Sequence, residues 1–294
     1  TLEDVMSIFD RKPEIIFVGH SWLNDDPKKN LLIKNKIDLS VKKYFKIFFL
    51  NKEYVKLNDK LKFFNENKFN LGFSHHHKVD LYSKETNTQC SFIPFAFNKD
   101  LFESQFNNQV KKYDLGFSGI IQNQNKNAEQ SDIRRRITKK LFHTFFDIPI
   151  IKKNRLSLFW NVIPSSRIAR YLATSFNYYK FYDVEDYIKK LFECKIYINT
   201  LSPINLVSPR YFETFASNSI LLCEKSNVYD KIFESELKYF TFDKDLKNFN
   251  DQVNSLLNDY GNIGDIISTN KKCVYNNHTW ENRVNKVIDL INKR

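Results

Sequence analysis

The run Ser208–Cys223 (SPRYFETFASNSILLC) carries the side chains best suited to chemistry. Serine is a good N-cap and proline favours the first helical position, so the run predicts a short helix, Ser208–Ser217, before a buried strand. Arg210 and Glu213 are three residues apart on this helix and are expected to point outward near its N-terminus. An arginine beside free backbone N–H groups suits a phosphate, and a carboxylate one turn later suits sugar hydroxyls. The alternative is an exposed charged pair without a ligand.

Histidines follow two predicted strands in the first third of the chain. His20 comes directly after Glu14–Gly19, and the run His75–His77 follows Asn70–Phe73. An imidazole titrates near neutral pH and can deprotonate a hydroxyl group. The alternatives for the run are a solvated loop or an adventitious metal site, although adjacent side chains point in different directions and rarely share one ion. The candidate catalytic residues are therefore His20, His75 and His76.

Strand-like and helix-like segments alternate along most of the chain, which predicts an α/β fold with parallel sheets. Apolar runs such as Tyr44–Leu50 and Lys195–Asn199 are typical of strands that are covered on both faces. The polar stretch Asn98–Lys112 is the best boundary, so we expect two domains, residues 1–97 and 98–294. The first domain is short, which indicates a reduced or truncated unit.

The composition excludes several classes of protein. A hydrophobic content of 42%, with 16% aromatic residues, is too high for a disordered chain. No apolar run approaches the roughly 20 residues of a membrane span. The four cysteines show no C-x-x-C spacing, so we expect free thiols in a reducing, cytoplasmic compartment and no metal site. Neither a G-x-G-x-x-G nor a P-loop pattern is present, so dinucleotide-dependent and P-loop classes have no direct support.

Four segments in chain order resemble one family. Ser208–Cys223 is similar to the donor-sugar segment of GT-B-fold glycosyltransferases, where an R-x-F-E-x-x-A-x-G pattern recurs. The likeness is greatest to the CgeB-like, group 1 branch. Ser91–Phe97 resembles the segment with P-F that joins the two domains in that branch. Tyr113–Gly119, with Arg134-Arg135 later, resembles its D-(V/L)-x-F-x-G turn and the R-R that follows. His278–Val284 resembles the H-T-(Y/W)-x-x-R-V start of its terminal helix.

The resemblance implies a GT-B architecture, with two Rossmann-like domains facing across a cleft and the N-terminal one reduced. It also implies that the last helix packs back on the N-terminal domain. The implied enzyme is a hexosyl- or pentosyltransferase that moves a sugar from a nucleotide-diphosphate sugar to a glycan, lipid-linked or protein acceptor without a metal or cofactor. Position by position, Glu213 matches the glutamate that holds the donor ribose. Ser208 and Arg210 match the region that faces the diphosphate or sugar, and Ser118 and Gly119 match the turn that approaches the phosphates or the acceptor.

Two positions depart from the family pattern. Asn205 stands where many retaining members carry a second glutamate, and Asn218 replaces a usual glycine, although asparagine also enters the left-handed conformation. The first departure leaves retention or inversion open, with Asn205 kept as a candidate donor-binding residue. Two alternatives therefore stand beside the transferase: a sugar-nucleotide epimerase on the same fold and a non-catalytic glycan- or nucleotide-binding domain.

The chain is basic, with 46 Lys and Arg against 34 Asp and Glu and a net charge of +12. A cluster of basic residues, Arg134–Arg136 with Lys139 and Lys140, lies on one predicted helix, Asp132–Phe146. It could neutralise a diphosphate, or it could lie against an anionic membrane that holds a lipid-linked acceptor. No nucleic-acid-binding motif accompanies it, and the charges are spread along the chain, so we expect no nucleic-acid partner.

Overall fold

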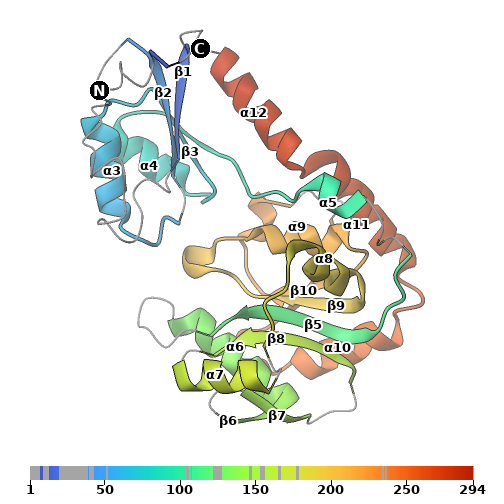
Figure 1. The fold of residues 1–294 in the computed structure, drawn as a ribbon. Helices are drawn as coiled ribbons and strands as arrows, with labels where there is room; N and C mark the ends of the chain where they lie inside the picture. Colours follow the sequence, from blue (N-terminus) through green and yellow to red (C-terminus); the bar gives the residue numbers. More distant parts are fainter. Residues whose placement is uncertain are drawn as a thin grey trace. The chain divides into compact units, whose positions relative to one another are not determined.

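The computed structural model describes residues 7–8, 13–19, 39, 43–50, 52–103, 106, 108–121, 128–145, 148–152, 156–164, 167–176, 179–233, 235 and 237–293. The chain divides into two compact units, Thr1–Pro94 and Phe95–Arg294, called here the N-terminal and C-terminal units. Figure 1 shows the course of the chain through both. The boundary expected from the sequence, between residues 97 and 98, lies three residues further along.

Within its described residues, the N-terminal unit is a parallel sheet with strand order β1-β2-β3-β4 and two helices. Its apolar strands form the core, because Phe48 of the second strand is fully buried and its ring contacts those of Phe64 and Phe69. The elements are β1 (Ile15–Gly19), β2 (Phe45–Leu50), α3 (Leu57–Glu66), β3 (Leu71–Ser74), α4 (Val79–Thr86) and β4 (Cys90–Phe92).

The described part of the C-terminal unit contains a second parallel sheet, of order β11-β10-β9-β5-β8, and an antiparallel pair, β6-β7. Its elements are α5 (Lys99–Glu103), β5 (Tyr113–Ile120), α6 (Ala128–Leu141), β6 (Phe142–Phe145), β7 (Ile148–Lys152), β8 (Leu158–Ile163), α7 (Arg167–Ser175), α8 (Val184–Phe192), β9 (Cys194–Asn199), η4 (Pro203–Asn205), α9 (Pro209–Ala216), β10 (Ile220–Glu224), η5 (Tyr229–Lys231), β11 (Phe240–Phe242), α10 (Phe249–Asn258), α11 (Gly264–Asn277) and α12 (Trp280–Asn292).

Helices cover both faces of this second sheet. Helices α6 and α10 pack with the strands in one apolar core that includes Leu115, Ile137 and Phe249. Helix α9 packs against β9 and β10 from the other face, with Tyr211 and Phe212 buried (Figure 1). The predicted doubly covered α/β sheet is confirmed.

The basic helix begins and ends earlier in the chain than the sequence predicted. Helix α6 ends at Leu141, whereas the predicted helix continued to Phe146. The residues after Leu141 form β6, which pairs with β7. The correction has a simple cause, since aromatic and β-branched residues dominate this stretch and favour a strand over a helix.

Two of the family-like segments meet where the chain enters the C-terminal unit. Phe97 forms a β-bridge with Thr279 and donates its backbone N–H to the His278 carbonyl at 3.3 Å. Arg283 is buried and donates to the Phe95 carbonyl at 3.2 Å and to His278 Nδ1 at 2.6 Å. The arginine of the terminal motif therefore joins α12 to the start of the unit. That the last helix packs back on the N-terminal domain stays a prediction.

A membrane-spanning helix is not found in the described part of the chain, where no helix is both long and apolar enough to cross a bilayer.

A partly buried lysine lies just before β5, where α9 ends. Lys111 Nζ donates to the Ser217 carbonyl at 3.3 Å and to Ser219 Oγ at 3.2 Å. Burial lowers the pKa of Lys111 to about 7, against a smaller opposing effect of Cys194. The ammonium form is therefore unfavourable in the folded protein.

Because the pKa of Lys111 is lowered, we expect the free energy of unfolding to increase with pH. In the unfolded chain a lysine has a pKa of about 10.4, so between pH 7 and 10 the unfolded state binds more protons than the folded one. The destabilisation of the folded state by the charged Lys111 is complete below pH 7 and is lost as the pH rises toward 10. Relative to Lys111→Met, we expect the wild-type free energy of unfolding to rise by about 3 kcal/mol across this window. Denaturant unfolding at several pH values measures it, and equal pH dependence of the two proteins would contradict the prediction.

Candidate functional site

A cavity of about 330 Å³ lies at the carboxyl ends of β5 and β8 in the C-terminal unit. The chain runs outward from β5 to β8 and then returns to the other side of β5 as β9. Ligands of open parallel sheets bind where the strand order reverses in this way. The residues that line the cavity are Ser118, Gly119, Ile120, Asn161, Ile163, Tyr179, Lys180, Phe181, Tyr182, Tyr187 and Arg210.

Arg210, at the start of α9, is held in a fixed position beside this cavity. Its guanidinium donates to the Ser118 carbonyl of β5 and, at 3.2 Å, to the Tyr187 hydroxyl of α8. Burial acts against its charge, but Tyr187, Tyr197 and Glu213 outweigh that effect, so the pKa of Arg210 is raised. The side chain is a permanent cation at the carboxyl end of β5.

Glu213 belongs to the same network. Its Oε2 accepts a hydrogen bond of 3.0 Å from the Tyr187 hydroxyl, which in turn accepts one from Arg210. Burial raises the pKa of Glu213, while Arg210 and Tyr187 act in the opposite direction. The expected outward position is wrong for this carboxylate, which is partly buried because Tyr187 of α8 lies against that face of α9.

A further arginine approaches the same strand end from α6. Arg134 donates from Nε to Thr200 Oγ1 at 2.8 Å and from Nη1 to the Ile120 carbonyl at 2.9 Å. Arg134 and Arg210 therefore each bind a backbone oxygen of β5, two residues apart along the strand. Guanidinium groups held in this way are suited to bind a diphosphate.

The remaining predicted donor-binding residues are placed differently. Gly119 lines the cavity, and Ser118 also places its hydroxyl 2.7 Å from that of Tyr197. Ser208 is the N-cap of α9, as predicted, although within the described chain its side chain caps no N–H group. Asn205 is exposed at the end of η4, has a φ of 61°, and is not among the cavity residues.

The histidine run lies at the carboxyl end of β3 in the N-terminal unit, and His75 and His76 are both buried. His75 Nδ1 is 2.7 Å from the Ile93 carbonyl, and His76 Nδ1 is 2.6 Å from the Tyr82 hydroxyl. The alternative of a solvated loop is therefore wrong for these two side chains. His20 lies outside the described residues.

A buried glutamate that sequence reasoning missed supports this histidine turn. Glu53 follows β2 and accepts a hydrogen bond from Ser74 Oγ, which itself accepts one of 2.9 Å from the His76 backbone N–H. Burial raises the pKa of Glu53. The sequence did contain a signal for Glu53, because an acidic residue shortly after a buried parallel strand lies at the edge of the sheet where ligands bind.

Comparison with known proteins gives the fold. Residues 160–289 match the model of a family described as glycosyl transferase-like. A search of curated proteins finds no match. Among solved structures, the sucrose-phosphate synthase from Thermosynechococcus elongatus has a TM-score of 0.62 at 10% identity, covering 99% of this chain and 76% of that one. HepE from Anabaena, in complex with UDP and glucose, has a TM-score of 0.60 at 9% identity, covering 100% and 81%. A mutant of S. aureus TarM, in complex with fondaparinux, alpha-GlcNAc-glycerol and UDP, has a TM-score of 0.58 at 12% identity, covering 85% and 51%.

The chain has the GT-B fold of glycosyltransferases. Its matched region in the family model runs from β8 to α12 and so contains Arg210 and Glu213. The chain spans only about half the length of TarM. The likeness to the CgeB-like branch stays a prediction.

The cavity at the ends of β5 and β8 is also lined by residues that belong to no motif recognised in the sequence. The segment Tyr179–Tyr182 forms one wall, and two hydrogen bonds fix it to β8, from Asn161 Nδ2 to the Lys180 carbonyl at 3.1 Å and from the Lys180 N–H to Asn161 Oδ1 at 3.0 Å. Tyr187 connects Arg210 to Glu213. These residues come from loop and helix positions that only the folded chain brings to the end of β5.

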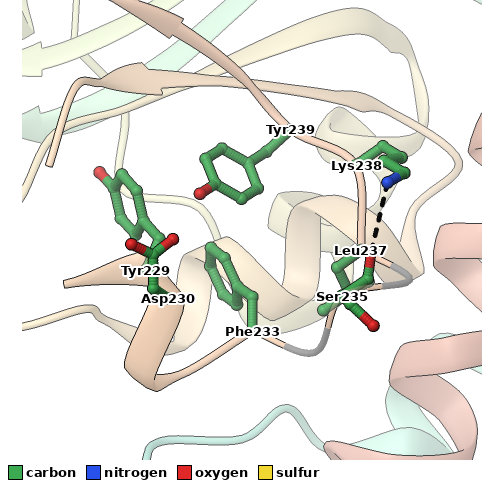
Figure 2. A pocket seen from close by; sticks show the side chains of 7 residues that line it. All are labelled: Tyr229, Asp230, Phe233, Ser235, Leu237, Lys238 and Tyr239. Atoms are coloured by element: carbon green, nitrogen blue, oxygen red, sulfur yellow. Dashed lines mark hydrogen bonds between the residues drawn. The ribbon is translucent and has the colours of Figure 1, made fainter. Parts of the chain in front are cut away.

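A second cavity, of about 440 Å³, lies beside η5 in the C-terminal unit (Figure 2). The rings of Tyr229, Phe233 and Tyr239 contact one another there, with centroids 5.1 to 5.5 Å apart. The Tyr229 hydroxyl donates to the Glu224 carbonyl at 2.8 Å. Because Tyr229 and Phe233 are themselves buried, these rings mainly pack against each other, and the cavity includes none of the predicted site residues.

Proposed function

We propose that this chain transfers a hexosyl or pentosyl group from a nucleotide-diphosphate sugar to a glycan, lipid-linked or protein acceptor. The observation that carries the proposal is the pair of arginines, Arg134 and Arg210, each bound to a backbone oxygen at the end of β5. Of the two, Arg210 lines the cavity. The glycosyl transferase-like family match and the UDP complex of HepE support the same assignment.

In this proposal the donor diphosphate lies at the end of β5 and the nucleoside enters the cavity. The bond between the anomeric carbon and the diphosphate breaks, and a new bond forms to an acceptor hydroxyl, whose proton passes to a base. The arginines stabilise the negative charge that develops on the departing diphosphate, which makes a metal unnecessary. Glu213 accepts a hydrogen bond from a donor hydroxyl, and His75 or His76 is the proposed base.

A non-catalytic nucleotide-binding domain is the second candidate. Asn205 favours it, because this exposed amide replaces the second glutamate of many retaining enzymes. As to location, Cys90, Cys194, Cys223 and Cys273 are buried free thiols, which supports our proposal of a cytoplasmic protein. Peripheral contact with a membrane surface is a separate part of the proposal.

Thermal unfolding in the presence of UDP, GDP, CDP and their sugars tests the proposal. A ligand that binds the folded state at about 100 times its Kd adds about 2.7 kcal/mol to the free energy of unfolding. We expect one nucleotide series to raise the unfolding temperature, and Arg210→Met to remove that shift. If none of these nucleotides shifts the midpoint, the proposal is wrong.

Turnover then separates the candidates. A transferase releases the nucleoside diphosphate and requires an acceptor or water, whereas an epimerase converts the sugar nucleotide without one. A shift in unfolding temperature without either reaction would show a binding domain.

A further inference from the structure

Positive charge is concentrated in one part of the chain, contrary to the even distribution expected above. Residues 133–182 contain eleven Lys and Arg against a single acidic residue, Asp147, a net +10 of the chain's +12. The elements in this stretch are most of α6, then β6, β7, β8 and α7, which Figure 1 shows together on the β8 side of the C-terminal unit. Acidic residues begin again at Asp183, where α8 starts.

Helix α7 exposes large apolar side chains within this basic region. It is held to the unit by Ala169 and Ala173, which pack against Tyr179. On its solvent side Ile168 is 71% exposed and Tyr171 is 72% exposed. These two residues are three positions apart and therefore share one face of the helix.

Two phenylalanines extend the same surface. Phe176, directly after α7, is 64% exposed and Phe181 is 81% exposed. The Phe181 ring contacts that of Tyr179, and the Tyr179 N–H donates to the Ala173 carbonyl at 3.1 Å, so this segment is attached to α7. Four large apolar side chains within fourteen residues are thus 64 to 81% exposed, and apolar groups clustered in this way mark an interaction surface, whereas single ones do not.

We propose that this surface, formed by Arg167, Ile168, Arg170, Tyr171, Phe176, Lys180 and Phe181, docks on an anionic membrane. Its only charged members are basic, so it complements negatively charged lipid headgroups, while the aromatic and aliphatic side chains enter the boundary between headgroups and acyl chains. Lys180 and Phe181 also line the cavity at β8, so docking would bring that cavity to the membrane surface. The inference does not require the proposed transferase activity, because vesicle binding is measured without a substrate.

Cosedimentation of the full chain with vesicles tests the inference. We expect binding to vesicles that contain phosphatidylglycerol, little binding to pure phosphatidylcholine, and loss of binding as salt is added. Replacing Ile168 and Tyr171 together by serine is expected to weaken binding about tenfold. Replacing Arg167 and Arg170 together by glutamine is expected to weaken it about tenfold or more and to reduce the salt dependence.

The matched control replaces two exposed apolar residues elsewhere, Leu81 (56% exposed) and Val110 (74% exposed), by serine and should bind vesicles like the wild type. Absence of binding by the wild type, or equal binding by the Ile168/Tyr171 variant, would overturn the inference. A dimer that this variant dissociates, without vesicle binding, would assign the surface to a second copy of the chain instead. The nucleotide-induced thermal shift is measured without vesicles, so failure of one proposal is distinguishable from failure of the other.

Discussion

The Arg210→Met variant is expected to lower kcat/KM for the nucleotide sugar by about 10³-fold, or about 4 kcal/mol. Methionine keeps most of the packing volume but removes the cation that the Ser118 carbonyl and the Tyr187 hydroxyl hold beside the cavity. The diphosphate would then depart without a positive charge fixed against it. Steady-state kinetics with the donor identified by thermal shift measures the loss.

Arg210→Lys is the matched control for this prediction. Lysine keeps the charge, but its single nitrogen cannot reproduce the planar fork with which Arg210 reaches Tyr187 from Nε and the Ser118 carbonyl from Nη1, so we expect an intermediate loss. Circular dichroism and the unfolding midpoint show whether each variant is folded. Full activity in a folded Arg210→Met protein would exclude this arginine from the donor site.

Replacing Glu213 by alanine is expected to weaken donor turnover by about 2–4 kcal/mol, a factor of about 30 to 900. The carboxylate is partly buried and bound to Tyr187, so its removal leaves both that hydroxyl and the donor hydroxyl without an acceptor. Kinetics at saturating acceptor separates this loss from an acceptor effect. Unchanged kinetics would remove Glu213 from the site.

Glu213→Gln separates the functional role of the carboxylate from its effect on stability. The amide oxygen still accepts from Tyr187, so the loss of turnover should be smaller than for alanine. Because burial raises the pKa of Glu213, the wild type loses stability relative to the glutamine variant as the pH rises above about 4.3. At pH 7 the variant should therefore unfold at the same or a higher temperature, and a lower midpoint would show that the ionised carboxylate stabilises the fold.

Much of the C-terminal unit is predictable from local patterns. Ser208 and Pro209 begin α9 as the sequence indicates, and Asn218 takes the left-handed conformation expected of it, with a φ of 55°. Strand β9 coincides with the apolar run Lys195–Asn199, and β10 is the buried strand expected after the helix. These features depend on capping, backbone preference and hydrophobic periodicity, which act over a few residues and are therefore visible in the sequence.

The candidate site depends more on contacts between distant residues. The sequence indicated the types of Arg210 and Glu213, but not that Tyr187 lies between them, 26 residues from the glutamate along the chain. Likewise, no local pattern shows that Glu53 reaches Ser74, 21 residues later. Parallel strands bring such residues to one sheet edge only after the sheet has formed.

The sequence by itself determined the α/β class and the arginine and the glutamate of α9, because each depends on residue type and near-neighbour spacing. Only the tertiary structure decided which side chains are buried, since burial depends on the neighbouring elements that cover a helix or strand face. It made Glu213 part of a network, buried His75 and His76, brought Arg134 to the end of β5 and left the apolar face of α7 exposed.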